Sequence, residues 1–141
     1  MVKIGDYKLP DDLYYHEKHI WAKVEGDLVR IGIDSIGLAI AGKIVFIRLK
    51  KEGRKIKAGK SIGTAEAGKG VIPITSPING EIAELNPKIG RRKTELLNQD
   101  PYGDGWIGLL KPTGNLEEEL SQLISGDQIE EWGKKEVEEI Q

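Results

Sequence analysis

Short β-branched stretches separated by turn residues are the feature that most constrains how this chain folds. Stretches with strand-like composition run from His19 to Val24, Leu28 to Ile33, Lys43 to Leu49, Ser61 to Glu66, Val71 to Thr75, Gly80 to Leu85 and Trp106 to Leu110. Glycine, asparagine, aspartate and proline, which favour turns, lie between them. Many short strands at this spacing predict a mostly β chain with a β-sandwich or flattened barrel at its centre.

A hairpin and one short helix are expected in the first third of the chain. The polar turn Glu25-Gly26-Asp27 joins the first two strands, and its glycine is free to adopt a positive φ. Asp34 can cap a short internal helix that runs from Ser35 to Ala41 and ends at Gly42.

A weak internal echo suggests that the β-body is built from two related halves. The segment Gly42-Lys43-Ile44-Val45-Phe46-Ile47 is similar to Gly80-Glu81-Ile82-Ala83-Glu84-Leu85. A basic loop that contains glycine follows each segment. Duplicated halves related by approximate two-fold symmetry would explain the pattern.

The C-terminal part of the sequence predicts two helices. Asn115 with Glu118, and Asp127 with Glu130, have the spacing of capping boxes. Apolar residues then recur on one face of each helix, at Leu116, Leu120, Leu123 and Ile124, and at Ile129, Trp132, Val137 and Ile140. We expect one domain over 1–141, with a β-body at about 14–111 and a helical extension at about 115–140 that packs on it.

Composition and charge exclude several classes of function. The net charge of −2 predicts no strong attraction to nucleic acid or to an anionic membrane. With no cysteine, the chain has no disulfide, thiolate metal ligand or cysteine nucleophile, so a redox sulfur would have to come from a cofactor. No apolar run is long enough to cross a bilayer, and the start of the sequence lacks the apolar stretch of a secretory signal. We therefore expect a cytoplasmic protein.

Lys69 is the candidate functional residue. Two predicted strands flank it, and Gly68 and Gly70 leave no neighbouring side chain to crowd its ammonium group, so the lysine can enter the active site of a modifying enzyme. A solvated lysine in a tight turn is the alternative interpretation, and it is the commoner one for a lysine chosen at random.

The residues around Lys69 resemble the glycine cleavage H-protein family. The family pattern has a glutamate three residues before a modified lysine, which is Glu66 here, and a Ser-Pro-x-Ser-Gly turn after it. Further matches occur in the same order along the chain, at His19-Ile20-Trp21, Ile31-Gly32-Ile33, Ser76-Pro77-Ile78-Asn79-Gly80 and Asn98-Gln99-Asp100-Pro101-Tyr102-Gly103-Asp104-Gly105-Trp106. Each motif is weak alone, but their joint order and spacing over roughly residues 14 to 135 are specific.

The resemblance implies both a fold and a cofactor. It implies a hammerhead-like β-sandwich of the lipoyl (barrel-sandwich hybrid) type, and lipoic acid bound covalently as an amide on Lys69. Glu66, Gly68 and Gly70 would then present Lys69 to a lipoate ligase or transferase, and His19 is a candidate contact for the arm. A carrier that must expose its arm to successive partners is expected to be a monomer.

The resemblance also implies the role of the chain and its partners. An H protein is a carrier rather than an enzyme. It takes an aminomethyl group from glycine decarboxylase, presents it to aminomethyltransferase and is reoxidised by dihydrolipoamide dehydrogenase. The partners supply the catalysis, and the tether supplies a high effective concentration of the bound intermediate.

Two departures from the family pattern leave the cargo open. The family has an acidic residue between the histidine and the tryptophan and another four residues after the lysine, where this chain has Ile20 and Pro73. An ammonium group that leaves water needs a counter-charge, and the family implies that these acids provide it. The alternative is therefore an H-like lipoate-binding protein that carries sulfur in a heterodisulfide-reductase-like oxidation pathway. A third alternative is a structural relative in which Lys69 is unmodified. The family also has valine and alanine where Gly68 and Gly70 flank the lysine, which predicts a less constrained tip.

Other candidate motifs are less consistent with the sequence. Gly59-Lys60-Ser61 is similar to the end of a phosphate-binding loop, but Gly53 is one position too far away and no helix is expected to follow. His16 and His19 have no further histidine or cysteine to complete a metal site. A basic run is interpreted as a solvated loop, with docking of an acidic partner as the alternative; it comprises Lys50, Lys51, Arg54, Lys55, Lys57 and Lys60. No serine–histidine–acid set is recognisable, which also favours a carrier over an enzyme.

Overall fold

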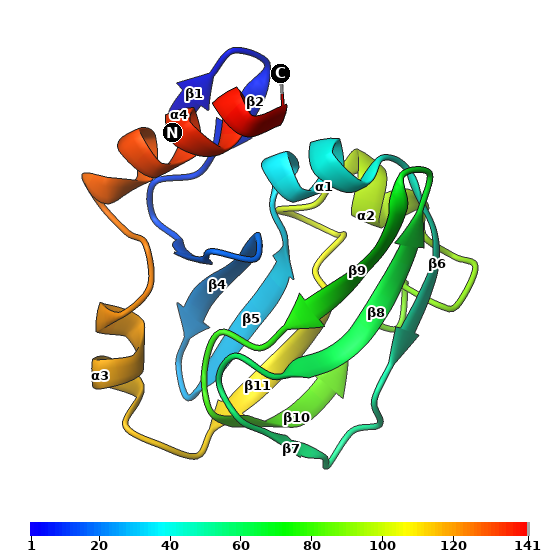
Figure 1. The fold of residues 1–141 in the computed structure, drawn as a ribbon. Coiled ribbons are helices and arrows are strands. Elements are labelled where there is room, and N and C mark those ends of the chain that lie inside the picture. The colour runs from blue at the N-terminus through cyan, green and yellow to red at the C-terminus, as the bar shows by residue number, and fades with distance from the viewer. Residues whose placement is uncertain (141) are drawn as a thin grey trace.

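A computed structural model describes residues 1–140 and shows two β-sheets packed face to face, with helices around them (Figure 1). One sheet has six strands in the order β3-β4-β5-β11-β10-β7, and the other has three in the order β6-β8-β9. The strands of the larger sheet are Tyr14–His16 (β3), Ile20–Glu25 (β4), Leu28–Ile33 (β5), Lys55–Ile56 (β7), Gly80–Leu85 (β10) and Gly108–Pro112 (β11). The strands of the smaller sheet are Ile44–Leu49 (β6), Ser61–Ala67 (β8) and Gly70–Thr75 (β9). The predicted mostly β fold is therefore confirmed.

The main hydrophobic core lies between the two sheets. Ile31 and Leu110 from the larger sheet and Ile47, Ala65 and Ile74 from the smaller one belong to one buried cluster. Along β8, buried Ala65 lies between exposed Thr64 and Glu66, as expected where one face of a sheet is buried.

The bulges and loop contacts of the two halves support the internal echo. The pairing of β6 shifts register between Ile44 and Phe46, and that of β10 shifts at the equivalent residues Ile82 and Glu84. The loop after each strand also crosses to the other half. The Ile47 amide donates to the Arg91 carbonyl at 2.9 Å, and the Ile82 amide donates to the Arg54 carbonyl at 2.9 Å.

The predicted internal helix and both predicted C-terminal helices are present. They are Ser35–Ala41 (α1), Leu116–Ser121 (α3) and Gln128–Ile140 (α4). The Asp34 carboxylate caps α1 by accepting from the Gly37 amide, and the Asn115 side chain caps α3 by accepting from the Glu118 amide. At the start of α4, the Gln128 side chain accepts a hydrogen bond from the Ser125 amide. The predicted capping box paired Asp127 with Glu130 instead.

Several elements differ from the sequence prediction. An N-terminal hairpin of Val2–Ile4 (β1) and Tyr7–Leu9 (β2), together with β3, β7 and the short helix Glu95–Gln99 (α2), were not predicted. Trp106 precedes β11, which begins at Gly108, whereas the predicted strand began at Trp106.

A second hydrophobic cluster joins the chain ends to the outer face of the larger sheet. Ile129 and Val137 of α4 pack with Leu9 of β2, Trp21 of β4 and Ile36 of α1. The apolar stripe of α4 therefore packs on the body of the protein, as predicted. Among residues 1–140, no helix is both long and apolar enough to cross a membrane.

Candidate functional site

Lys69 lies at the tip of the hairpin formed by β8 and β9. The last paired residues of the hairpin are Ala67 and Gly70, so Gly68 and Lys69 form a two-residue turn. Lys69 is exposed, and apart from the adjacent residues of the chain no atom lies within 4 Å of where a side chain at Gly68 or Gly70 would begin. The tip therefore places a single long side chain in an uncrowded position.

The backbone of this tip is held in place. The Gly68 amide donates to the Lys43 carbonyl at 3.1 Å, and the Lys69 amide donates to the Ala41 carbonyl at 2.8 Å. Gly42 passes beneath the tip with a φ of 87°, and a Cβ there would lie 3.4 Å from Lys69 Cγ. The flanking glycines predicted a less constrained tip, whereas these contacts fix its backbone and leave only the lysine side chain free to move. The Lys69 ammonium makes one long hydrogen bond, 3.4 Å to the Ala39 carbonyl at the end of α1.

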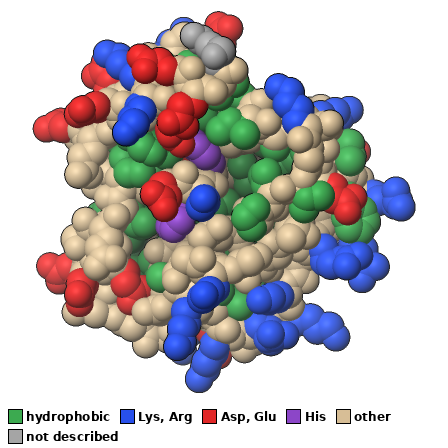
Figure 2. Space-filling view, in the orientation of Figure 1, with side chains coloured by type: hydrophobic (Ala, Val, Ile, Leu, Met, Phe, Trp, Pro, Cys, Tyr) green, Lys and Arg blue, Asp and Glu red, His purple; other side chains and the backbone are tan. Residues whose placement is uncertain are grey.

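A surface groove begins beside Lys69. Two adjoining hollows share Ile40 and Glu136 among their lining residues, and their volumes are about 350 and 270 Å³. Lys69 lines the first hollow, and His19 and Pro73 line the second. Figure 2 shows histidine side chains on this face among hydrophobic and acidic ones. A flexible arm on Lys69 would have an amphipathic groove beside it.

His19 lies at the far end of this groove and is held by two carboxylates. Its Nδ1 lies 3.1 Å from Asp34 Oδ2, its Nε2 lies 2.9 Å from Glu136 Oε1, and its ring stacks on Trp132 with centroids 5.1 Å apart. Within residues 1–140, His19 is the one non-glycine residue with a positive φ, at 68°. A backbone conformation of this kind costs energy and persists only where surrounding contacts hold it in place. It is commoner at functional sites than elsewhere.

The environment of His19 favours its protonated form. Burial opposes the charge, but the hydrogen bond and charge of Asp34, followed by those of Glu136, outweigh it and raise the pKa of the imidazole. Asp34 is fully buried and also accepts the Gly37 amide at 2.8 Å. The same aspartate therefore caps α1 and orients His19.

The two positions where the family pattern has acids have different environments here. Ile20 is 1% exposed and belongs to the core between the sheets, so it does not line the groove. Pro73 does line the groove. Two carboxylates nevertheless lie there, because Glu17 from the loop before β4 and Glu136 from α4 are both lining residues.

The structure separates the other sequence candidates from the groove. Nδ1 of His16 accepts a hydrogen bond from the Lys18 amide at 3.0 Å. The nitrogens of His19 face Asp34 and Glu136 instead. The six residues of the basic run are exposed, and within residues 1–140 none of them forms an ion pair. Figure 2 shows lysine and arginine side chains gathered along the lower edge of the molecule.

The late motif that contains Tyr102 and Trp106 forms a packed turn. The Pro101 carbonyl accepts the Trp21 indole N–H at 3.0 Å, and the Tyr102 hydroxyl accepts the Ser35 amide at 2.9 Å. Earlier in the motif, the Asn98 side chain exchanges two hydrogen bonds with the backbone of Ile44.

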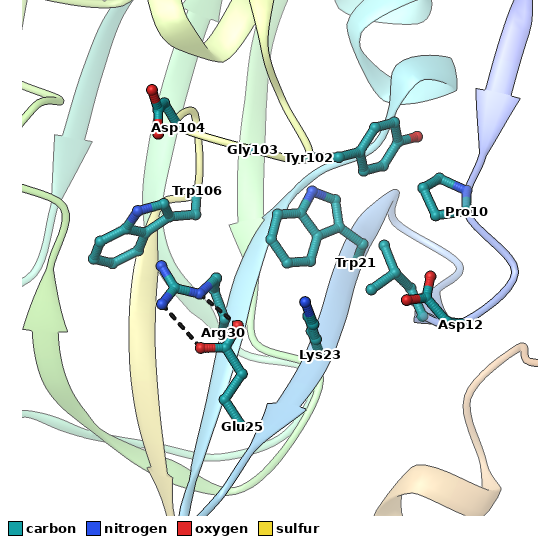
Figure 3. Close-up of a pocket in the computed structure, with 11 residues that line it drawn as sticks. Pro10, Asp12, Trp21, Lys23, Glu25, Arg30, Tyr102, Gly103, Asp104 and Trp106 are labelled. Carbon is teal, nitrogen blue, oxygen red and sulfur yellow. Dashed lines mark hydrogen bonds and ion pairs between the residues drawn. The ribbon is translucent and has the colours of Figure 1, made fainter. Parts of the chain in front are cut away.

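Another hollow, of about 390 Å³, lies beside this turn rather than beside Lys69 (Figure 3). The Arg30 guanidinium stacks on Trp106 at 4.4 Å and forms a bidentate pair with Glu25 at 2.7 and 2.9 Å. Because these charged groups satisfy one another, the hollow offers less to a ligand than its size suggests.

Sequence reasoning did not identify Ile40 and Glu136 as groove residues. Glu136 meets His19 across 117 residues of chain, a contact that no local pattern encodes. The acidic face of α4 was visible in the sequence, but it gave no indication of which glutamate would contact the β-body.

Comparison with known proteins finds relatives that share one description. The family described as Glycine cleavage H-protein matches residues 13–136. The chain is 42% identical to "Glycine cleavage system H protein 2" of Aquifex aeolicus, with 96% of this chain and 86% of that protein covered. It is 36% identical to "Probable glycine cleavage system H protein" of Pyrococcus abyssi, with 95% of this chain and 98% of that protein covered.

A solved structure agrees with these sequence matches. A crystal structure of a glycine cleavage system H protein from Mycobacterium marinum superposes with a TM-score of 0.66 at 32% identity. The match covers 81% of this chain and 98% of that one.

Proposed function

The chain belongs to the glycine cleavage H-protein family, and we propose that it works as a carrier with lipoic acid attached as an amide to Nζ of Lys69. The position of Lys69 carries this proposal. Its side chain is exposed at an uncrowded tip whose backbone is fixed by two hydrogen bonds. A lipoyl group supplies a disulfide that can accept a reactive fragment and be restored by oxidation.

The residues around the groove fit such an arm. Ile40, Ile72 and Pro73 line it and can cover the apolar part of the arm from water. Glu136 lines both hollows, and Glu17 lines the hollow that Lys69 does not. An arm that lies along these residues would place a cationic cargo near carboxylates, which reduces the cost of removing its charge from water.

We infer that the cargo is the aminomethyl group released by glycine decarboxylase and passed to aminomethyltransferase, with dihydrolipoamide dehydrogenase as the third partner. Glu17 and Glu136 favour this cargo, because they supply negative charge that Ile20 and Pro73 do not. A lipoate ligase or transferase would attach the arm.

The chain itself is proposed to be a carrier without catalysis of its own. His19 is the one histidine that lines the groove, and both of its ring nitrogens face carboxylates. It therefore has no free nitrogen to exchange a proton with a reacting group.

A second candidate function is carriage of sulfur in a heterodisulfide-reductase-like pathway. Pro73 favours it, because an apolar residue in the groove wall suits an uncharged cargo. The two candidates share the lipoyl arm on Lys69 and differ only in what it carries.

The arm is tested by co-expression with a lipoate ligase, followed by peptide mass spectrometry. The lipoyl mass is expected on the fragment that contains Lys69 and should be lost in Lys69→Arg. Lys60→Arg is the matched control, because Lys60 is another exposed lysine next to a glycine with positive φ. An unmodified Lys69, in cells that lipoylate a known H protein, would contradict the proposal.

The cargo is tested with purified glycine decarboxylase and glycine. The lipoylated protein is expected to gain the aminomethyl mass, and Glu17→Gln with Glu136→Gln should reduce this gain. Failure to react with a decarboxylase that accepts another H protein would reject glycine cleavage and favour the sulfur pathway.

A further inference from the structure

We propose that an apolar row on the outer face of the smaller sheet, made of Val45 and Val71 on either side of Glu66, is the surface that the lipoate-attaching enzyme binds when it modifies Lys69. This proposal rests on the proposed function, because it concerns how the arm is installed. It assigns a role to two valines that no motif identified.

Strand pairing brings the three residues together. Val71 on β9 pairs directly with Glu66 on β8, so their side chains point to the same face. Val45 is the extra residue of the β6 bulge, between Ile44, which pairs with Ala67, and Phe46, which pairs with Glu66. The row therefore crosses all three strands of the sheet. It lies next to the end of the hairpin that carries Lys69.

The exposure of the two valines is unusual for residues of their type. Val45 is 53% exposed and Val71 is 62% exposed, while many other aliphatic residues of the sheets are buried in the core. Ile40, 41% exposed, lies on the other side of the tip beside Lys69. Apolar residues clustered on a surface around a functional group indicate a contact surface more than apolar residues scattered singly do.

The length of the lysine side chain requires close contact by the modifying enzyme. Before the arm is attached, the reacting atom is Nζ, at the end of a four-carbon stem. Nζ must attack the carbonyl carbon of an activated lipoyl group. The activating group then leaves that carbon, and the new amide nitrogen loses a proton. A protein that brings this carbonyl to Nζ has to lie against the tip, and a stable interface covers about 800 Å² on each partner. Such a footprint extends from the tip onto the flanking strands.

The outer face of the sheet is the more open side of the tip. On the groove side, α4 stands beside Lys69 and contributes Glu136, Glu139 and Ile140. Figure 1 shows β8 and β9 in front of the larger sheet, with no helix over them in that view. An approaching protein can thus cover Val45, Glu66 and Val71 without displacing part of this chain.

The row also specifies the chemistry of its partner. Within residues 1–140, Glu66 is exposed and makes no hydrogen bond or ion pair through its carboxylate. A carboxylate covered by another protein needs a cation or donors to replace water. The attaching enzyme is therefore expected to place apolar groups on the valines and a basic side chain on Glu66.

The test compares Val45→Asp and Val71→Asp with Val24→Asp. Val24 is the matched control, because it is a valine of β4, 42% exposed, outside the smaller sheet. Unmodified proteins are incubated with a lipoate–protein ligase, lipoate and ATP, and initial rates are read from the mass of the Lys69 fragment over a range of carrier concentrations. Direct binding of each unmodified protein to the ligase is measured in parallel.

We expect Val45→Asp and Val71→Asp to lower kcat/KM for lipoylation by about tenfold or more, mainly by raising KM, and to weaken binding correspondingly. Val24→Asp should match the wild type. If an aspartate variant fails to fold, the Val→Ser substitution at the same position replaces it and is compared with Val24→Ser. Rates and affinities equal to those of the control would overturn the proposal. A wild type that is never lipoylated would instead reject the proposed function itself.

Discussion

Nε2 of His19 lies 2.9 Å from Oε1 of Glu136 and joins the turn before β4 to the C-terminal helix across 117 residues of chain. Both residues line the same hollow of the groove. It also links α4 to the aspartate that caps α1, because the other nitrogen of His19 lies 3.1 Å from Asp34. The wall of the groove is thus tied to the β-body through one titratable ring.

This link makes the stability of the protein depend on pH. The folded state raises the pKa of His19, so the stabilisation from its protonated form is fully present below the unfolded-state pKa and is lost as the pH rises through the folded-state pKa. Each unit of difference between the two pKa values corresponds to about 1.4 kcal/mol. We expect the free energy of unfolding to fall as the pH increases above about 6.5, the ordinary pKa of histidine.

The His19→Asn variant isolates this effect. Asparagine tolerates a positive φ better than most residues and does not titrate. Burial is the largest cause of the lowered pKa of His16 and is the same in both proteins, whereas the charge of His19 is the smallest cause, so most of the His16 contribution cancels in the difference. The difference in unfolding free energy between wild type and variant, from denaturant titrations, should therefore be largest at low pH. A difference that is constant with pH would argue against a protonated His19 in the folded state.

A single glutamate adds a polar attachment of α3 to the body, beside the packing of Leu116 and Leu120 against the core. Helix α3 contains no buried residue, but the Glu119 carboxylate accepts the backbone amide of Asn79 and its side-chain amide, the latter at 3.0 Å. Hydrogen bonds to a charged group contribute about 1.5–3 kcal/mol. We expect Glu119→Ala to destabilise the protein by a similar amount and to speed hydrogen exchange in 116–121. Glu117→Ala, on the same helix, should change stability by less than about 0.5 kcal/mol.

The fold could be predicted from the sequence where the information is local. Strand-like composition between turn residues located β4 to β6 and β8 to β10, and Asp34 and Asn115 were identified as caps because a capping residue acts within one turn. The hairpin of β1 and β2 could not be predicted in this way. Its strands have three residues each, and they are stabilised by packing against α4, which lies at the other end of the chain.

The same distinction applies to the candidate site. The tip around Lys69 could be recognised from two glycines between two strands, which is a local pattern. The groove could not, since its walls come from α1, β9, the start of β4 and α4. Ile20 shows the limit of a position-by-position comparison. It occupies the place of a family acid, yet its side chain belongs to the core.

Trp21 restricts which residue can stand opposite it on β5. Gly32 pairs with Trp21, and a Cβ at Gly32 would lie 2.5 Å from the indole ring. The indole cannot move away easily, because it is 1% exposed and its N–H is bonded to the Pro101 carbonyl. We expect Gly32→Ala to destabilise the protein by about 1–3 kcal/mol, as overpacking of a core does.

The control for this substitution is Gly90→Ala, whose Cβ would make ordinary contacts of 3.6 Å or more with Lys93. Thermal unfolding of the two variants should separate them clearly. Equal melting temperatures would mean that β4 and β5 can adjust around the indole.

The two glycines at the tip are expected to differ in what they tolerate, although no atom lies near either of them. Gly70 has a φ of 142°, a conformation that residues with a side chain rarely adopt, and it is the first residue of β9. Gly68 has no such φ. A residue forced into this region costs about 1–3 kcal/mol, whereas replacement of a glycine at a compatible position stabilises by about 0.4–1 kcal/mol. We therefore expect the Gly70→Ala variant to be less stable than the wild type, and the Gly68→Ala variant to be as stable as the wild type or more so, in denaturant unfolding of the unmodified protein.

The resemblance to the H-protein family makes this test informative, since that family usually has alanine after the lysine. A stable Gly70→Ala would show that the tip can adopt another turn, in which case the fixed backbone described here would not be required to present Lys69.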